Sequence, residues 1–124
     1  MGLDFIKVLI VDDEEDIRNL GQMMLADEGY DVLTAKNAGE AITKAEEEKP
    51  DIILMDIVMP GRNGFDACKI LKFKPATKEI PVVMFSALGR DVDKEMADEA
   101  GAEAYITKPF DKEKLLELIE EHTK

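Results

Sequence analysis

The chain has 124 residues, 45% hydrophobic and 35% charged, a mixture typical of one globular domain. Its formal net charge of −12 opposes binding to nucleic-acid phosphates. There is no apolar run near the ~20 residues of a membrane span, no recognisable signal peptide, and a single cysteine, Cys68, which cannot form an internal disulfide. We therefore expect residues 1–124 to form one cytoplasmic domain that neither spans a membrane nor binds nucleic acid directly.

Strand and helix patterns alternate along the chain. Short apolar runs rich in β-branched residues indicate buried strands, and apolar positions at helical spacing indicate helices. In chain order we expect a strand at 8–11, a helix at 15–28, a strand at 32–35, a helix from 38 to about 48, a strand at 52–55, a helix at 64–73, a strand at 82–85, a helix at 91–100, a strand at 104–107 and a helix after Asp111.

Several residues predict where helices begin and end. Asn37, with Glu40 three positions later, resembles a capping box, and Asp111 is a second N-cap candidate. Gly29 and Gly101 are expected to stop the helices before them, and Pro50 to end the helix that precedes it.

Apolar stripes predict which helix faces are buried. We expect the helix at 15–28 to bury Ile17, Leu20, Met24 and Leu25, the one at 64–73 to bury Phe65, Cys68 and Leu71, the one at 91–100 to bury Val92, Met96 and Ala100, and the last one to bury Leu115, Leu118 and Ile119. We also expect Met23, Met24 and Met96 to serve packing rather than binding.

Five strands in strict alternation with five helices define the expected fold class. Crossovers between parallel strands are right-handed, which places helices on both faces of the sheet. The prediction is an α/β, doubly wound, five-stranded parallel sheet. The flavodoxin-like strand order 2-1-3-4-5 is assumed by analogy with that fold.

Polar residues follow the predicted strands at the edge where ligands bind in such sheets. Asp12 and Asp13 follow the first strand, Asp56 the third, Ser86 the fourth and Lys108 the fifth. Each of these residues alone is more simply a turn or surface residue. Together they predict an acidic site that a hard divalent cation would stabilise, because like charges destabilise one another and Mg²⁺ prefers carboxylates, water and phosphate oxygens.

The chain resembles the receiver domains of two-component response regulators over its whole length. The matching segments lie in the family's order and spacing: Ile10-Val11-Asp12-Asp13-Glu14, Met55-Asp56-Ile57-Val58-Met59-Pro60, Gly61-Arg62-Asn63-Gly64-Phe65, Phe85-Ser86-Ala87 and Ile106-Thr107-Lys108-Pro109-Phe110.

The resemblance implies roles for these residues. Asp56 would accept a phosphoryl group from a histidine kinase or a phosphotransfer protein. Asp13 and Asp56 would bind Mg²⁺ directly, Asp12 through water, and Val58 through its backbone carbonyl. Ser86 would bond the phosphoryl group, Lys108 would neutralise it, and Tyr105 would turn inward as Ser86 moves. The face formed by the fourth helix, the fifth strand and the fifth helix would then signal to a protein target.

Two positions are associated with the lifetime of the phosphoryl group in this family: the second residue after the acceptor and the second after the switch hydroxyl. Here they are Val58 and Leu88, both apolar, so neither can hold a water in line with phosphorus. We expect slow self-hydrolysis, and no enzymatic activity beyond phosphoryl transfer to Asp56 and its hydrolysis.

Other functions fit the sequence less well. A receiver-like module that binds partners without phosphorylation should lack site residues, and none is missing. An aspartyl phosphatase of the haloacid dehalogenase type would need Asp rather than Glu14 in its Asp-x-Asp pair, and an FMN protein would need a hydroxyl-rich loop after the first strand. Three questions stay open: the partner, a monomeric or weakly dimeric state, and whether the domain stands alone or belongs to a larger protein.

Overall fold

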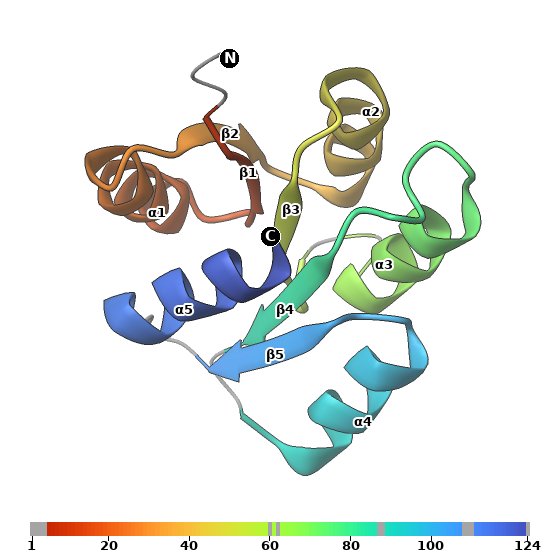
Figure 1. Cartoon of the computed structure of the whole chain (residues 1–124). Coiled ribbons are helices and arrows are strands. Elements are labelled where there is room, and N and C mark those ends of the chain that lie inside the picture. The colour runs from red at the N-terminus through yellow and green to blue at the C-terminus, as the bar shows by residue number, and fades with distance from the viewer. Residues whose placement is uncertain (1–4, 60, 62, 87–88, 108–110, 124) are drawn as a thin grey trace.

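The computed structural model describes residues 5–59, 61, 63–86, 89–107 and 111–123 (Figure 1). Strands and helices alternate as predicted, in the order β1 (Lys7–Val11), α1 (Glu15–Asp27), β2 (Asp31–Ala35), α2 (Ala38–Glu48), β3 (Ile52–Asp56), α3 (Gly64–Phe73), β4 (Val82–Ser86), α4 (Asp91–Glu99), β5 (Ala104–Thr107) and α5 (Lys112–His122). No helix within these ranges is long and apolar enough to cross a membrane.

The strands form one parallel five-stranded sheet in the order β2-β1-β3-β4-β5. This confirms the predicted flavodoxin-like topology. The chain leaves β1 in one direction to form β2 and then crosses back to β3 on the other side of β1. The carboxyl ends of β1 and β3 therefore lie side by side, at the crevice where open α/β sheets bind ligands.

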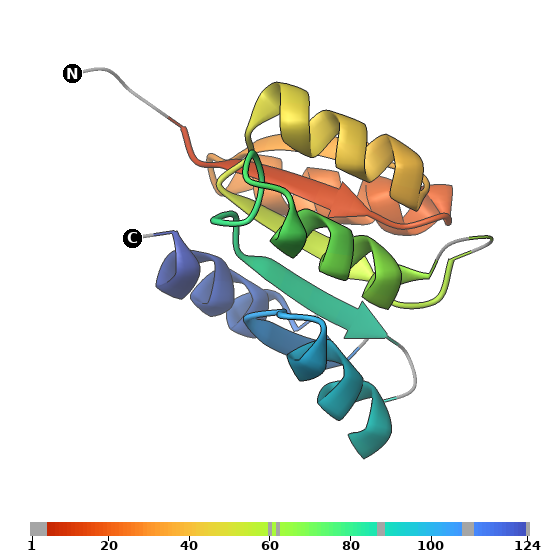
Figure 2. The ribbon, with the colours of Figure 1, turned by 90° about the vertical axis from the view of Figure 1, so that its right-hand side faces the viewer.

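Helices cover both faces of the sheet: α1 and α5 lie on one face, and α2, α3 and α4 on the other (Figures 1 and 2). The alternation of side chains along each strand creates the two matching halves of the core. In β1, Val8 and Ile10 pack with Leu25, Leu115 and Ile119 of α1 and α5. The alternate residues of β1, Leu9 and Val11, pack in the half that α2, α3 and α4 cover. Both faces of the central strands are thereby buried, which explains their unbroken apolar runs.

Most of the predicted helix ends are confirmed. The side chains of Asn37 and Asp111 accept backbone N–H bonds at the starts of α2 and α5. Gly29 and Gly101 adopt positive φ angles of 92° and 93°, conformations open to glycine without a Cβ penalty. The end of α2 is also as predicted: the helix ends at Glu48, and Lys49 adopts the left-handed region directly before Pro50.

Two predicted apolar stripes are wrong in part. In α1, Leu20 is 51% exposed and Met23 is exposed as well. The reason is Gly21, which brings α1 so close to the sheet that an added Cβ would lie 2.7 Å from Ile10 Cδ1. The helix therefore faces the core through Gly21 and Leu25, while Leu20 turns outward.

In α4, Val92 is 49% exposed and Met96 is 41% exposed, whereas Asp93 and Ala97 are buried. Burial of the Asp93 carboxylate is possible because Arg90 binds both of its oxygens, at 3.0 and 3.1 Å. The prediction that Met23 and Met96 serve packing is also wrong, while Ala100, Leu115 and Ile119 are buried as expected.

Candidate functional site

The three predicted site carboxylates converge at the carboxyl edge of the sheet. Asp12 and Asp13 follow β1, and Asp56 is the last residue of β3. Each offers a carboxylate oxygen that lies within 4.8 Å of the other two. Asp12 and Asp56 are buried, whereas Asp13 is exposed and keeps the cluster open to solvent.

Hydrogen bonds between Asp12 and other described residues hold the turn after β1. Its N–H donates to the Ala35 carbonyl at the end of β2, at 3.1 Å. Its Oδ1 accepts from the Glu14 N–H at 2.9 Å, and its backbone carbonyl accepts from Arg18 Nη1 at 2.8 Å. The sequence alone did not single out Arg18, although a cation shortly after an acidic run is a visible signal.

Hydrogen bonds link Val58 to Asp56 and the start of α3 to Ile57. The Val58 N–H donates to Asp56 Oδ1 at 3.3 Å, and the Gly64 N–H donates to the Ile57 carbonyl at 2.9 Å. A Cβ on Gly64 would lie 2.3 Å from the Asp56 carbonyl oxygen, closer than real Cβ contacts allow. Gly64 is therefore needed where α3 starts against the end of β3, a requirement that sequence reasoning missed.

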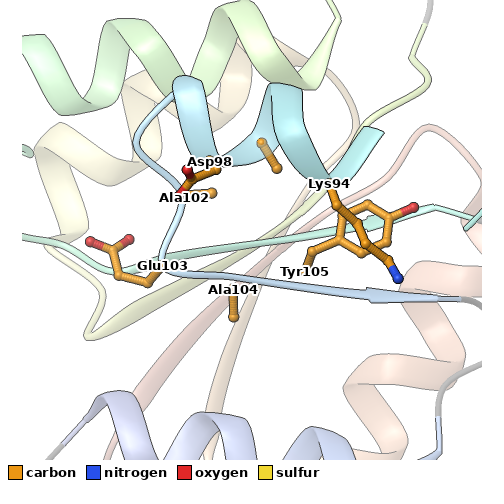
Figure 3. A pocket seen from close by; sticks show the side chains of 7 residues that line it. Lys94, Asp98, Ala102, Glu103, Ala104 and Tyr105 are labelled. Atoms are coloured by element: carbon orange, nitrogen blue, oxygen red, sulfur yellow. The ribbon is translucent and has the colours of Figure 1, made fainter. Parts of the chain in front are cut away.

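Ser86 lies at the end of β4, where it is buried and paired in register with Thr107 of β5. Tyr105 lies two residues earlier on β5 and is half-buried. Its hydroxyl is a buried atom without a hydrogen-bond partner among the described residues. Tyr105 also lines a small cavity of about 150 Å³ between α4 and β5, together with Lys94 and Glu103 (Figure 3).

The remaining predicted site residues are Val58, Leu88 and Lys108. Val58 lies next to the acidic cluster and is 61% exposed, so it does not pack in the core. Lys108 and Leu88 lie outside the described residues.

The donor set fits a hard divalent cation. All three side chains offer carboxylate oxygens, which Ca²⁺ and Mg²⁺ prefer over nitrogen or sulfur. The cluster combines two buried carboxylates with an exposed one, so a cation there would keep access to water and to a phosphate oxygen.

Away from the carboxyl edge, the Cys68 thiol of α3 is buried and donates to the Ala100 carbonyl at 3.5 Å. Burial raises the pKa of this thiol to about 11, and the nearby Lys72 ammonium opposes the rise only in part. Cys68 is therefore a neutral core residue, as the sequence suggested, rather than a reactive thiolate.

Comparison with known proteins agrees with this arrangement. A family model described as the response regulator receiver domain matches residues 8–120. The chain belongs to this family, and is thus a receiver domain of the two-component response regulator type.

Solved structures of the family superpose over nearly the whole chain. Chemotaxis protein CheY4 of Vibrio cholerae is 33% identical, with a TM-score of 0.91 and coverage of 96% of this chain and 99% of that one. A CheY-like receiver domain protein of Methanospirillum hungatei is 33% identical, with a TM-score of 0.86 and coverage of 95% and 93%.

The receiver domain of the sensor histidine kinase PA1611 from Pseudomonas aeruginosa is 25% identical, with a TM-score of 0.89 and coverage of 97% and 98%. That structure carries a magnesium ion coordinated in its active-site cleft.

Proposed function

We propose that this receiver domain is switched by phosphorylation of Asp56, with Mg²⁺ bound beside it. The observation that carries the proposal is the convergence of Asp12, Asp13 and Asp56 within 4.8 Å at the crevice between β1 and β3. Gathering three carboxylates costs free energy unless a cation offsets the repulsion. Binding of a cation would account for a carboxylate cluster that otherwise destabilises the fold.

The proposed reaction is a single phosphoryl transfer. An ionised carboxylate oxygen of Asp56 attacks the phosphorus of a phosphohistidine on a histidine kinase or phosphotransfer protein. The new O–P bond forms as the P–N bond breaks, and the bonding pair stays on the histidine nitrogen, which takes up a proton. Water later attacks phosphorus, releases inorganic phosphate and restores the carboxylate. We propose no catalysis beyond these two steps.

Asp12, Asp13 and Asp56, with the backbone carbonyl of Val58, would hold Mg²⁺. When bound, the ion supplies positive charge that stabilises the equatorial phosphoryl oxygens during transfer. The magnesium ion in the cleft of the PA1611 receiver domain supports this assignment. The turn after β1 supports it too, because its hydrogen bonds hold Asp12 in place before any ligand arrives.

The proposed switch uses Ser86, Tyr105 and Lys108. Phosphorylation adds a charge of about −1.5 to −2 and three acceptor oxygens. The Ser86 hydroxyl, at the end of β4, bonds one of these oxygens, and Lys108 neutralises another. Tyr105 gains space as Ser86 moves, and the surface of α4, β5 and α5 shifts between two packings that a protein target distinguishes. The Tyr105 hydroxyl supports this. It lacks a hydrogen-bond partner among the described residues, so a second conformation in which it gains one would be favoured.

The apolar side chains of Val58 and Leu88 should prolong the phosphorylated state. Neither can orient a water for in-line attack on phosphorus. Replacing Val58 by Asn, an exposed change that leaves the core intact, should speed loss of phosphate several-fold, as followed by intact mass after removal of the donor. An unchanged rate would remove Val58 from this explanation.

We also propose where and with what the domain works. It acts in the cytoplasm, where a free thiol such as Cys68 stays reduced. Its partners are a phosphodonor protein and a protein target, and its net charge of −12 argues against direct contact with nucleic acid. It functions as a monomer or a weak homodimer.

Intact-mass spectrometry after incubation with acetyl phosphate and Mg²⁺ tests the proposal. We expect a gain of one phosphoryl group that disappears in Asp56→Ala and without Mg²⁺. If neither protein gains mass and BeF₃⁻ also fails to bind, the domain is instead a partner-binding module that works without phosphorylation.

A further inference from the structure

We propose that Arg18 is a positioning residue for the metal-binding carboxylates, because it fixes the peptide group that joins Asp12 to Asp13. The inference rests on the proposed Mg²⁺ site and assigns a role to a residue on α1 that supplies no ligand atom. Its basis is the hydrogen bond of 2.8 Å from Arg18 Nη1 to the Asp12 backbone carbonyl.

The position of Arg18 on α1 explains how it reaches back over six residues. Its N–H donates to the Glu14 carbonyl at 3.1 Å in the first turn of the helix. Side chains on an α-helix tilt toward the N-terminus, so a long residue in the first turns returns toward the segment before the helix. The guanidinium of Arg18 thereby meets the turn that carries Asp12 and Asp13.

Asp13 depends on the backbone for its orientation. It is exposed, and no hydrogen bond or ion pair of its side chain is found within the described part of the chain. Its Cα–Cβ direction follows from the peptide plane before it, whose carbonyl Arg18 holds. Asp12 differs, since its N–H and Oδ1 are separately bonded to Ala35 and Glu14. Loss of Arg18 should therefore misplace Asp13 more than Asp12.

The charge of Arg18 predicts the opposite effect from its geometry. A cation close to the cluster repels Mg²⁺, so removing the charge alone would tighten metal binding. Removing a residue that orients a ligand would weaken it, typically by about 10-fold or more for an outer partner of a metal site. The sign of the change in Mg²⁺ affinity therefore separates a positioning role from a purely electrostatic one.

The test is an Mg²⁺ titration of ¹⁵N-labelled protein, followed by NMR at the amides next to Asp13 and Asp56. We expect Arg18→Met to raise the Mg²⁺ dissociation constant about 10-fold. Arg18→Lys, which keeps the charge and one reachable donor, should stay within about 3-fold of the native chain. Lys78→Met is the matched control, because it removes one charge from an exposed residue before β4, at the opposite edge of the sheet, and should leave the dissociation constant unchanged.

Tighter or unchanged Mg²⁺ binding by Arg18→Met would overturn the inference while leaving the proposed metal site intact. Absence of any Mg²⁺-dependent shift in the native chain would instead contradict the proposed function. Thermal unfolding of each variant checks its fold. If Arg18→Met does not fold, Arg18→Gln, whose shorter side chain cannot reach the Asp12 carbonyl, replaces it with the same expected weakening.

Discussion

The two edges of the sheet group their charges differently. At the amino edge, lysines pair with carboxylates and with backbone carbonyls. Lys72 lies 2.7 Å from Glu103, Lys74 lies 2.9 Å from Glu46, and Lys49 Nζ donates to the Ala76 carbonyl at 3.1 Å. At the carboxyl edge, three carboxylates gather within 4.8 Å. The amino edge thus holds paired charges, whereas the carboxyl edge holds a cluster of like charges.

The comparison shows that different interactions hold the two edges together. Glu103 ties the amino edge together, since one oxygen accepts from Lys72 and the other from the Val82 N–H at 2.7 Å. Such bonds join the residue before β5 to α3 and to the start of β4. The carboxyl edge instead relies on backbone geometry, including the bonds of Asp12 and the close approach at Gly64. Substitutions at the two edges should therefore lower the unfolding free energy for different reasons.

The largest effect is expected from Gly64→Ala at the carboxyl edge. The added Cβ would lie 2.3 Å from the Asp56 carbonyl oxygen, so the backbone has to shift. We expect a loss of about 3 kcal/mol of unfolding free energy in urea, at the upper end for overpacking. Gly39→Ala in α2 is the matched control, because its Cβ would meet only Asn37 Oδ1 at 3.5 Å. That variant should be neutral or stabilised by up to about 1 kcal/mol, and equal losses in both would contradict the crowding at Gly64.

The next effect concerns Cys68, which lies close enough to the Lys72–Glu103 pair to respond to it. Its pKa is raised from 9.0 to about 11 in the fold, so the folded chain keeps a proton that the unfolded chain loses. The resulting stability is fully present below pH 9 and is lost as pH rises through about 11. By linkage the loss is on the order of 2 kcal/mol.

The measurement is the difference in unfolding free energy between the native chain and Cys68→Ala, at pH 8 and at pH 11. Taking the difference removes the titration that both proteins share. The advantage of the native chain should shrink with rising pH, and a constant difference would mean that the thiol titrates normally.

A smaller effect is expected from Lys72→Met at the amino edge. The Lys72 side chain is only 15% exposed and also donates to the Ile80 carbonyl at 2.8 Å, so its loss leaves partly buried acceptors unpaired. We expect a cost of about 1 kcal/mol. Lys74→Met, which breaks a pair exposed on both sides, should cost under about 0.5 kcal/mol. Urea titrations compare the two, and a larger loss in Lys74→Met would reverse the ranking. Neither variant should change phosphorylation.

Much of the fold could be predicted from local patterns. Runs such as Val8–Val11 are too apolar for an exposed strand. Asn37 and Asp111 mark helix starts because their side chains accept hydrogen bonds from backbone N–H groups that have no partner within the helix. The strand order was assumed by analogy with the flavodoxin-like fold, since periodicity carries no information about which strands are neighbours.

The errors have a physical cause that helical spacing cannot reveal. In α4, burial of Asp93 depends on the two bonds from Arg90, and hydrophobicity alone assigns that position to solvent. In α1, the glycine at position 21 rather than Leu20 meets the sheet.

The site was predictable in outline, because strand ends gather at one edge of a parallel sheet. The roles of Arg18 and Gly64 were not predicted. An arginine soon after an acidic run is visible in the sequence, but its bond to a carbonyl and the close backbone approach at Gly64 are not.

The most direct test of the contrast between the edges is the thermal stability of the native chain and Asp13→Asn, each with and without Mg²⁺. Asp13 is exposed, so the substitution leaves the core intact and removes one charge from the cluster. Without metal, Asp13→Asn should melt at a higher temperature, because repulsion is relieved by roughly 0.5 kcal/mol. Mg²⁺ should stabilise the native chain and have little effect on the variant. Equal melting temperatures without metal, or equal stabilisation of both proteins by Mg²⁺, would contradict the account that the carboxyl edge gathers charge for a cation.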